Sequence, residues 1–367
     1  AIRIAAERDM VINVDAVEEI STLVHLGEEL GRPVRAGIRL KAMTSEYEEA
    51  ETDYFGGGPG GLSEYVRRVK WGFTPNAAAP LIEQMVASPF IAMVGYHFHI
   101  GRATRDPRFT KAWATALGGL VADLFRRTGF APELIDVGGG WPRERDPESK
   151  ALEFNEHSIE DYARIACDAL RMQLDDVGIG LPELWLEPGR YIAGNAVVLL
   201  TSVGAIKRDL DQIWVNVDAS TNDLPRIDTS GSAYHVVPAS HMDRLLTENV
   251  TIVGPTCTDA ILGRDRAMPD LRGGDVVAVL DAGMYAESAS TQFNSVPRPA
   301  TVLVSGERVD LVKERESIHD VFAKHRIPER FRQDQDGDGE AESATLKTED
   351  GDAPQPVETE GSAAARS

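Results

Sequence analysis

The sequence predicts an α/β domain followed by an all-β domain, and two observations lead to this prediction. Up to Arg190, apolar strand-like runs alternate with helical stretches, which is typical of parallel barrels and sheets. Beyond Arg190, short apolar runs follow one another between turn residues and without long helices. We therefore expect a partial (β/α)8 TIM-type barrel, followed by a β-sandwich or β-barrel domain.

The first half contains about five candidate strands, where a closed barrel needs eight. Asp15 followed by Glu18 resembles a capping box and precedes an apolar helical face. The other expected helices span residues 76–87, 107–127 and 158–174. The expected strands span residues 10–14, 34–40, 91–100, 133–137 and 183–186. This half is thus predicted to be an incomplete barrel.

The second half is predicted to consist of short strands separated by turns. These strands span residues 197–205, 213–217, 234–237, 250–253, 276–280 and 301–304. Beyond about residue 332 the chain is acidic, small and polar, so disorder is expected there. The predicted domains are residues 1–192, residues 193–328 and an acidic tail at 329–367.

Composition and charge argue against several classes of protein. The formal net charge is −21 at pH 7, whereas nucleic-acid binding calls for a basic surface. No apolar run approaches the roughly 18 residues of a membrane-spanning helix. The two cysteines, Cys167 and Cys257, do not make a disulfide framework, so we expect a cytoplasmic protein. Such acidity is also typical of salt-adapted surfaces.

Three predicted strands end in residues that carry chemistry. The ends hold His97 and His99, then Asp136 with Gly138, Gly139 and Gly140, and then Glu187-Pro188-Gly189-Arg190. The Pro-Gly pair stops the third strand, so Glu187 and Arg190 lie at its carboxyl edge. In a barrel, active sites lie at this edge.

These three ends together offer what a pyridoxal phosphate site requires. The glycine-rich turn lets backbone N–H groups approach a phosphate. A carboxylate such as Glu187 keeps the ring nitrogen protonated, and His97 or His99 can pack on the ring. Ordinary explanations also exist: a tight turn for the glycines, structural histidines, and an exposed ion pair between Glu187 and Arg190.

The second half adds two segments of interest. Residues 254–259 place Cys257 in a turn, where a thiol is open to reaction. Residues 281–285, Asp-Ala-Gly-Met-Tyr, end another strand with the phenol of Tyr285. Cys167, by contrast, lies within an amphipathic helix and is expected to fill the core.

Taken in order, these segments resemble the fold-type III pyridoxal-phosphate decarboxylases, the ornithine/diaminopimelate/arginine decarboxylase family. The shared motifs are Phe-His-Ile-Gly, Gly-Gly-Gly, Glu-Pro-Gly-Arg, Gly-Pro-Thr-Cys and Asp-Ala-Gly-Met-Tyr, followed by Phe293-Asn294 and Pro297-Arg298-Pro299. The resemblance spans roughly residues 4 to 325 and is greatest to the diaminopimelate enzymes. It implies an alanine-racemase-like fold, pyridoxal 5′-phosphate as cofactor, and amino-acid decarboxylation.

The resemblance also implies a role for each motif. His99 would stack on the cofactor ring, and Glu187 would bind its pyridine nitrogen. The phosphate would lie near Gly138, Gly139, Gly140, Gly189, Arg190 and Tyr285. Cys257 would donate a proton to the carbanion that remains after carbon dioxide leaves, and it would do so across a homodimer interface. Candidate substrate contacts are Arg190, Arg226, Asp259 and Tyr285.

The sequence departs from the family in several places. The family's Schiff-base lysine lies on the first barrel strand, whereas this chain reads as beginning in the helix before the fourth; Lys41 is a local substitute. Arg102 stands where a serine often follows His-Ile-Gly. The diaminopimelate enzymes carry Glu after the cysteine, where this chain has Thr258 and then Asp259. Residues 222–226 replace their Arg-Pro-x-x-Tyr segment.

Two other classes of protein remain open. A metal-dependent barrel hydrolase would use His97 and His99, which are two residues apart on one strand and share a face. A non-catalytic relative of the family would explain why the Schiff-base lysine is not evident.

Two further segments stand apart from these motifs. The glycine-rich stretch at 43–62 is expected to be a lid or insertion, and Asp334 begins a calcium-loop-like run that lacks the final Glu.

Overall fold

The computed structural model describes residues 1–41, 67–99, 105–145, 154–230 and 232–331. Ala1–Val321 form one compact unit. The glycine-rich stretch at 43–62, Arg102 and residues 332–367 of the acidic tail, with their calcium-loop-like run, lie outside the described residues. Among the described residues, no helix is both long and apolar enough to cross a membrane.

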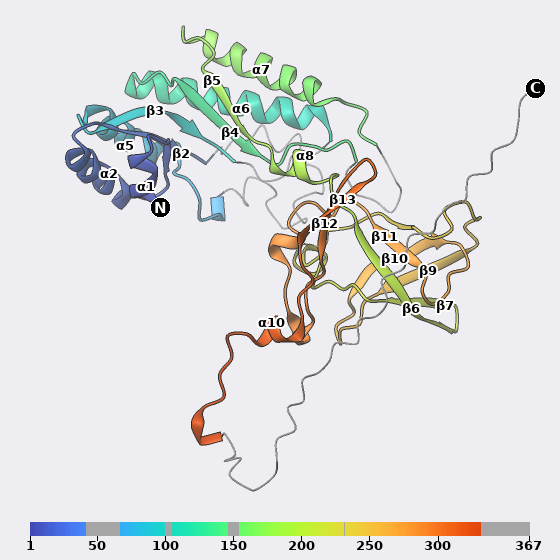
Figure 1. The fold of residues 1–367 in the computed structure, drawn as a ribbon. Helices are drawn as coiled ribbons and strands as arrows, with labels where there is room; N and C mark the ends of the chain where they lie inside the picture. The colour runs from blue at the N-terminus through green and yellow to red at the C-terminus, as the bar shows by residue number, and fades with distance from the viewer. Residues whose placement is uncertain (42–66, 100–104, 146–153, 231, 332–367) are drawn as a thin grey trace, which may run out of the picture. The chain divides into compact units, whose positions relative to one another are not determined.

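The first half is built on a five-stranded parallel sheet of order β1-β2-β3-β4-β5 (Figure 1). Its strands are β1 (Ile12–Val14), β2 (Val34–Arg39), β3 (Ile91–His97), β4 (Leu134–Gly139) and β5 (Glu183–Glu187). Its helices are α1 (Ile2–Glu7), α2 (Val17–Leu30), α5 (Pro75–Ala87), α6 (Pro107–Thr128), α7 (Ile159–Asp175) and α8 (Gly189–Ala193). Strand and helix alternate as predicted, which confirms an α/β first half.

Local caps fix the ends of the helices. Ser158 caps α7 by accepting a hydrogen bond from Asp161 N, and the Asp161 carboxylate accepts one in return from Ser158 N. At α2 the predicted capping box is one residue off. Glu19, not Glu18, accepts from the backbone N–H of Asp15 and Ala16, because the Asp15 carboxylate instead accepts from Gly72 N.

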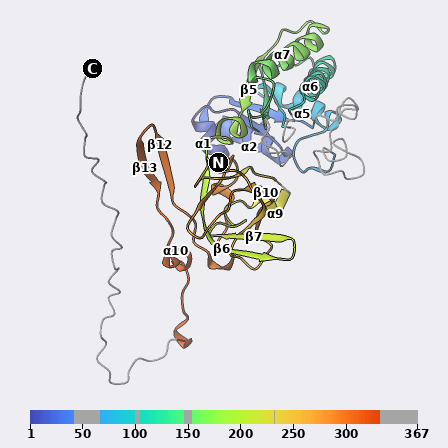
Figure 2. The ribbon, with the colours of Figure 1, turned by 90° about the vertical axis from the view of Figure 1, so that its right-hand side faces the viewer.

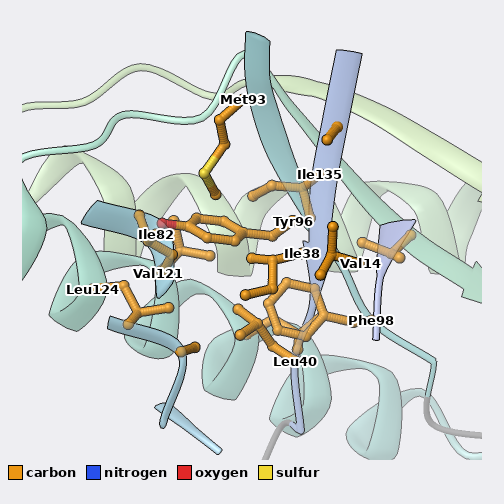
Figure 3. Packing of buried hydrophobic residues seen from close by; sticks show 14 of the residues in the cluster. Val14, Ile38, Leu40, Ile82, Met93, Tyr96, Phe98, Val121, Leu124 and Ile135 are labelled. Atoms are coloured by element: carbon orange, nitrogen blue, oxygen red, sulfur yellow. The ribbon is translucent and has the colours of Figure 1, made fainter. Parts of the chain in front are cut away.

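One hydrophobic core lies between the parallel sheet and its helices. Tyr96 and Ile38, from the middle strands, pack with Ile82 of α5 and with Val121 and Leu124 of α6 (Figure 3). All five side chains are fully buried. Burial also raises the pKa of the Tyr96 phenol. Because the core holds β3 and β4 rigidly, it fixes where their carboxyl ends project.

The second half contains a six-stranded sheet of order β10-β9-β7-β6-β11-β8. Its strands are β6 (Leu199–Asp209), β7 (Gln212–Val217), β8 (Val236–Pro238), β9 (Glu248–Val253), β10 (Ile261–Met268) and β11 (Val276–Val279). β6 and β7 form a long antiparallel pair (Figure 2). The sheet is nearly closed, since β10 and β8 at its two ends contact each other. An all-β second half is confirmed.

The remaining elements are short. The helix α9 (Arg226–Ser230) precedes β8, and the 3-10 turns η2 (Glu287–Ala289) and η3 (Phe293–Ser295) follow β11. A separate hairpin is formed by β12 (Thr301–Ser305) and β13 (Arg308–Lys313). The last elements are α10 (Ile318–Phe322) and η4 (Glu329–Phe331).

Candidate active site

The three predicted strand ends lie side by side. His97 at the end of β3 is in register with Asp136 of β4, and Gly139 at the end of β4 is in register with Glu187 of β5. His97 Nε2 lies 3.6 Å from Glu187 Oε1, and His99 Nδ1 lies 3.9 Å from Glu187 Oε2. The half-exposed Glu187 carboxylate therefore lies next to both imidazole rings.

His97 is the buried member of this group. Its side chain is 6% exposed, and its Nδ1 has no hydrogen-bond partner among the described residues. Burial lowers the pKa of His97, as does Arg39, although Asp136 and Glu187 act in the opposite direction. The ring is therefore held neutral near pH 7.

His99 lies just beyond the end of β3 and is more accessible. Its Nδ1 accepts a hydrogen bond of 3.2 Å from the backbone N–H of Gly139, so its proton sits on Nε2. Burial is the main cause that lowers the pKa of His99, with Arg39 adding to it. A neutral ring of fixed tautomer is thus presented at the strand ends.

The glycine turn requires glycine for steric reasons. Gly138 and Gly140 have φ of +72° and +87°, a region that side chains rarely adopt. A Cβ on Gly139 would lie 2.2 Å from the carbonyl oxygen of Glu187. The N–H of Gly138 donates to Asp136 Oδ1 at 2.9 Å, and that of Gly139 donates to His99. The turn is therefore held by hydrogen bonds to Asp136 and His99, which also lie around Glu187.

Arg190 follows Glu187 by three residues, in the short helix α8. Its side chain is buried, with the whole residue 6% exposed. Gly189, by contrast, has open space where a Cβ would be. Glu187 and Arg190 thus differ in exposure: the Glu187 carboxylate is half-exposed beside the histidines, whereas the Arg190 side chain is buried.

A buried ion pair that the sequence did not reveal links the loop after the glycine turn to the end of β11. Arg145 contacts Asp281 through Nε at 2.9 Å and through a terminal nitrogen at 2.7 Å. Asn195 Nδ2 donates to Asp281 Oδ1 at 2.6 Å. The Asp281 side chain is fully buried. The sequence does show that Asp281 begins a turn directly after an apolar strand. It could not show that the partner is Arg145, because the two residues are 136 positions apart.

Two other predicted residues, Arg226 and Tyr285, lie together. The Arg226 guanidinium stacks over the Tyr285 ring, 4.9 Å from its centroid. Tyr285 is 57% exposed and lines a cavity of about 520 Å³. An exposed aromatic ring beside a cation and a cavity is suited to contact a small anionic or zwitterionic molecule.

Cys257 lies in an exposed turn of the second half, as predicted. Its sulfur accepts a hydrogen bond of 3.3 Å from Asn294 Nδ2. Next to it, the hydroxyls of Thr256 and Thr258 are 3.0 Å apart, and Asp259 is exposed. Among the described residues, no hydrogen bond or ion pair joins Cys257 or Asp259 to the strand-end group. Cys167 is half-buried in α7.

The structure also bears on two other predicted roles. Ligand atoms of His97, Asp136 and Glu187 all lie within 4.8 Å of one another, a geometry that a metal ion could use. His99 is not in that group. The ammonium of Lys41 donates to the carbonyl oxygens of Arg67 and Val69, at 3.2 and 2.7 Å.

Comparison with known proteins agrees with this geometry. The family model described as pyridoxal-dependent decarboxylase, C-terminal sheet domain, matches residues 15–283. The chain belongs to this family. The family resemblance inferred from the motifs is therefore confirmed, and its pyridoxal 5′-phosphate cofactor is that of the family.

Several relatives are diaminopimelate decarboxylases. The enzyme of Methanothermobacter thermautotrophicus is 35% identical over 253 residues, which are 69% of this chain and 58% of the relative. That of Archaeoglobus fulgidus is 32% identical over 86% of this chain and 71% of the relative. The solved structure of the M. jannaschii enzyme with L-lysine has a TM-score of 0.76 and 25% identity, covering 89% of this chain and 72% of that one. The chain thus spans 58% to 72% of the length of these relatives.

Proposed function

We propose that this protein is a pyridoxal-phosphate-dependent decarboxylase of an amino acid, with diaminopimelate as the first candidate substrate. The observation that carries the proposal is the meeting of Glu187, His99 and the glycine turn at three neighbouring strand ends. The relatives that carry the name diaminopimelate decarboxylase support the choice of substrate.

The residues at the strand ends fit this cofactor. The half-exposed Glu187 carboxylate is available to a protonated ring nitrogen, and the neutral His99 ring offers a flat face beside it. Because Gly138 and Gly140 have no side chain, the backbone at these positions can come close to a phosphate. Because the N–H groups of Gly138 and Gly139 already have partners, we assign the phosphate mainly to the backbone at Gly140 and at Gly189, and propose Arg190 and Tyr285 as its side-chain contacts.

The bound cofactor supplies an electron sink for the electron pair released when the carboxylate leaves as carbon dioxide. Glu187 would hold a proton at the ring nitrogen, which strengthens that sink. His99 would fix the plane of the ring. Because burial lowers the pKa of both His97 and His99, the two rings beside Glu187 are neutral, and no imidazolium competes with the cofactor for its carboxylate.

Cys257 is proposed as the proton donor to the carbon that lost carbon dioxide. Its exposure in this chain supports a role at the surface of a neighbouring subunit, so each site would be shared within a homodimer. Arg226, Asp259, Arg190 and Tyr285 would contact the substrate. Of these, Arg226 and Tyr285 are already in contact with each other.

The proposal is tested by measuring carbon dioxide release from diaminopimelate, lysine, ornithine and arginine by the full protein that carries this chain. Glu187→Gln is expected to lower turnover by about 10²–10⁴-fold, because the proton at the ring nitrogen is lost. Glu183→Gln, at the other end of the same strand β5 and also exposed, is the matched control and is expected to keep its activity. Turnover unaffected by Glu187→Gln would refute the proposed role.

The lysine that carries the cofactor can be located in the same protein. Borohydride reduction fixes pyridoxal phosphate to that lysine, and peptide mass mapping then identifies it. We expect a lysine other than Lys41, because the Lys41 ammonium already donates to two backbone carbonyls. Label on Lys41 would overturn this expectation.

A metal-dependent hydrolase is the second candidate function, favoured by the group of His97, Asp136 and Glu187. It predicts metal in the purified protein and no dependence on pyridoxal phosphate.

We further propose that the first half is part of a (β/α)8 barrel and that residues 1–192 and 193–328 are the two domains. We also propose that the protein works in the cytoplasm.

A further inference from the structure

Asn294, a residue that the proposed mechanism does not use, holds the thiol of Cys257. Its Nδ2 donates to Cys257 Sγ at 3.3 Å, from a position 37 residues further along the chain. Cys257 is exposed, so packing alone does not fix its side chain. Within the part of the chain that the structure describes, the hydrogen bond from Asn294 is therefore the contact that orients the sulfur.

The turn that carries Asn294 is anchored by a buried amide. Asn222, which is 6% exposed, donates from Nδ2 to the carbonyl oxygen of Phe293 at 2.9 Å. The backbone N–H of Thr291 donates to Asn222 O at 3.0 Å, and the Thr291 hydroxyl lies 3.3 Å from Asn222 Oδ1. The residues on the N-terminal side of Asn294 are thus fixed by three contacts to one side chain and its backbone.

The backbone of Asn294 restricts which residue can occupy this position. It has φ 56° and ψ 26°, in the left-handed region. Asparagine is one of the few residues with a Cβ that adopt this conformation readily. An amide also donates a hydrogen bond without being able to take up or lose the proton that a catalytic thiol must deliver.

We propose that Asn294 is the positioning residue for the Cys257 thiol. The inference rests on the proposed function in that Cys257 delivers a proton to substrate. In that step the S–H bond breaks and leaves its electron pair on sulfur, while the carbanion's electron pair forms the new C–H bond. A hydrogen bond to a charged acceptor is roughly twice as strong as one to a neutral acceptor, so Asn294 stabilises the thiolate that this step produces.

The test measures the rate at which iodoacetamide alkylates Cys257, located by peptide mass spectrometry so that Cys167 does not interfere. Asn294→Gly removes the amide and suits the left-handed backbone. We expect alkylation near neutral pH to slow by about 3- to 10-fold, the effect of losing one hydrogen bond to the thiolate. At high pH, where the thiol is fully ionised, the variant and the parent should react at similar rates.

Ser295→Gly is the matched control, because Ser295 has the same left-handed backbone with φ 59° and lies one residue further along. It is expected to leave the alkylation rate unchanged. Asn294→Asp is expected to slow alkylation further than Asn294→Gly, since a carboxylate repels the thiolate. Equal rates for the parent and Asn294→Gly near neutral pH would overturn the proposal.

Turnover in the full protein separates this inference from the proposed function. If Cys257→Ala lowers the rate of carbon dioxide release, Asn294→Gly should lower kcat in the same direction and leave KM unchanged, because the amide acts on the thiol and not on substrate binding. If Cys257→Ala has no effect on turnover, the proposed role of the thiol fails. The alkylation rates then still decide whether Asn294 positions the sulfur.

Discussion

At the scale of single residues, the buried histidines make the stability of this protein sensitive to acid. His97 and His235 are buried, and burial is the main cause that lowers the pKa of each. An unfolded histidine titrates near a pKa of about 6.5. Below that pH the unfolded chain binds protons that the folded chain does not, so the free energy of unfolding falls as the pH falls toward the lower folded pKa.

Urea unfolding at a series of pH values between neutral and mildly acidic tests this prediction. His97→Gln should lose less stability than the parent as the pH falls, by up to about 1.4 kcal/mol for each pH unit between the unfolded and folded pKa. His235→Gln should change the profile in the same direction. Parallel profiles for the parent and both variants would contradict the prediction.

At the scale of secondary structure, the register between β4 and β5 positions Glu187. Gly139→Ala would bring a Cβ within 2.2 Å of the Glu187 carbonyl oxygen, so the two strands must separate. We expect a loss of about 1–3 kcal/mol in the free energy of unfolding and weaker binding of pyridoxal phosphate, followed by its absorbance. Gly180→Ala, just before β5, where a Cβ also meets open space, should keep both. Equal cofactor affinity in the two variants would contradict the proposed dependence of Glu187 on register.

The sequence predicted these elements unevenly, and the reasons are physical. The meeting of His97, Gly139 and Glu187 could be predicted because carboxyl ends of neighbouring parallel strands share one edge. The strand β10 was missed because Asp265, with φ 49°, lies at a register shift that interrupts the alternation of apolar residues. The contact between Arg145 and Asp281 joins residues far apart in sequence, which no local pattern shows.

At the scale of the whole molecule, a site shared between two subunits predicts complementation between inactive variants. In a symmetric dimer, one subunit would contribute Glu187 and its partner Cys257. Glu187→Gln and Cys257→Ala are each expected to be poorly active alone. When the two are unfolded together and refolded, half of the dimers are mixed and each mixed dimer has one intact site, so about a quarter of the parent activity should return.

In the control, each variant is refolded separately and the two are then mixed. Stable dimers exchange subunits slowly, so few mixed dimers should form. Sedimentation of the refolded mixture shows whether dimers have formed. Activity that stays at the level of the separate variants, in a mixture that is dimeric, would mean that Glu187 and Cys257 do not meet across an interface. In that case the exposed thiol, although held by Asn294, would have no part in the partner's chemistry, and proton delivery would have to come from another group at the strand ends.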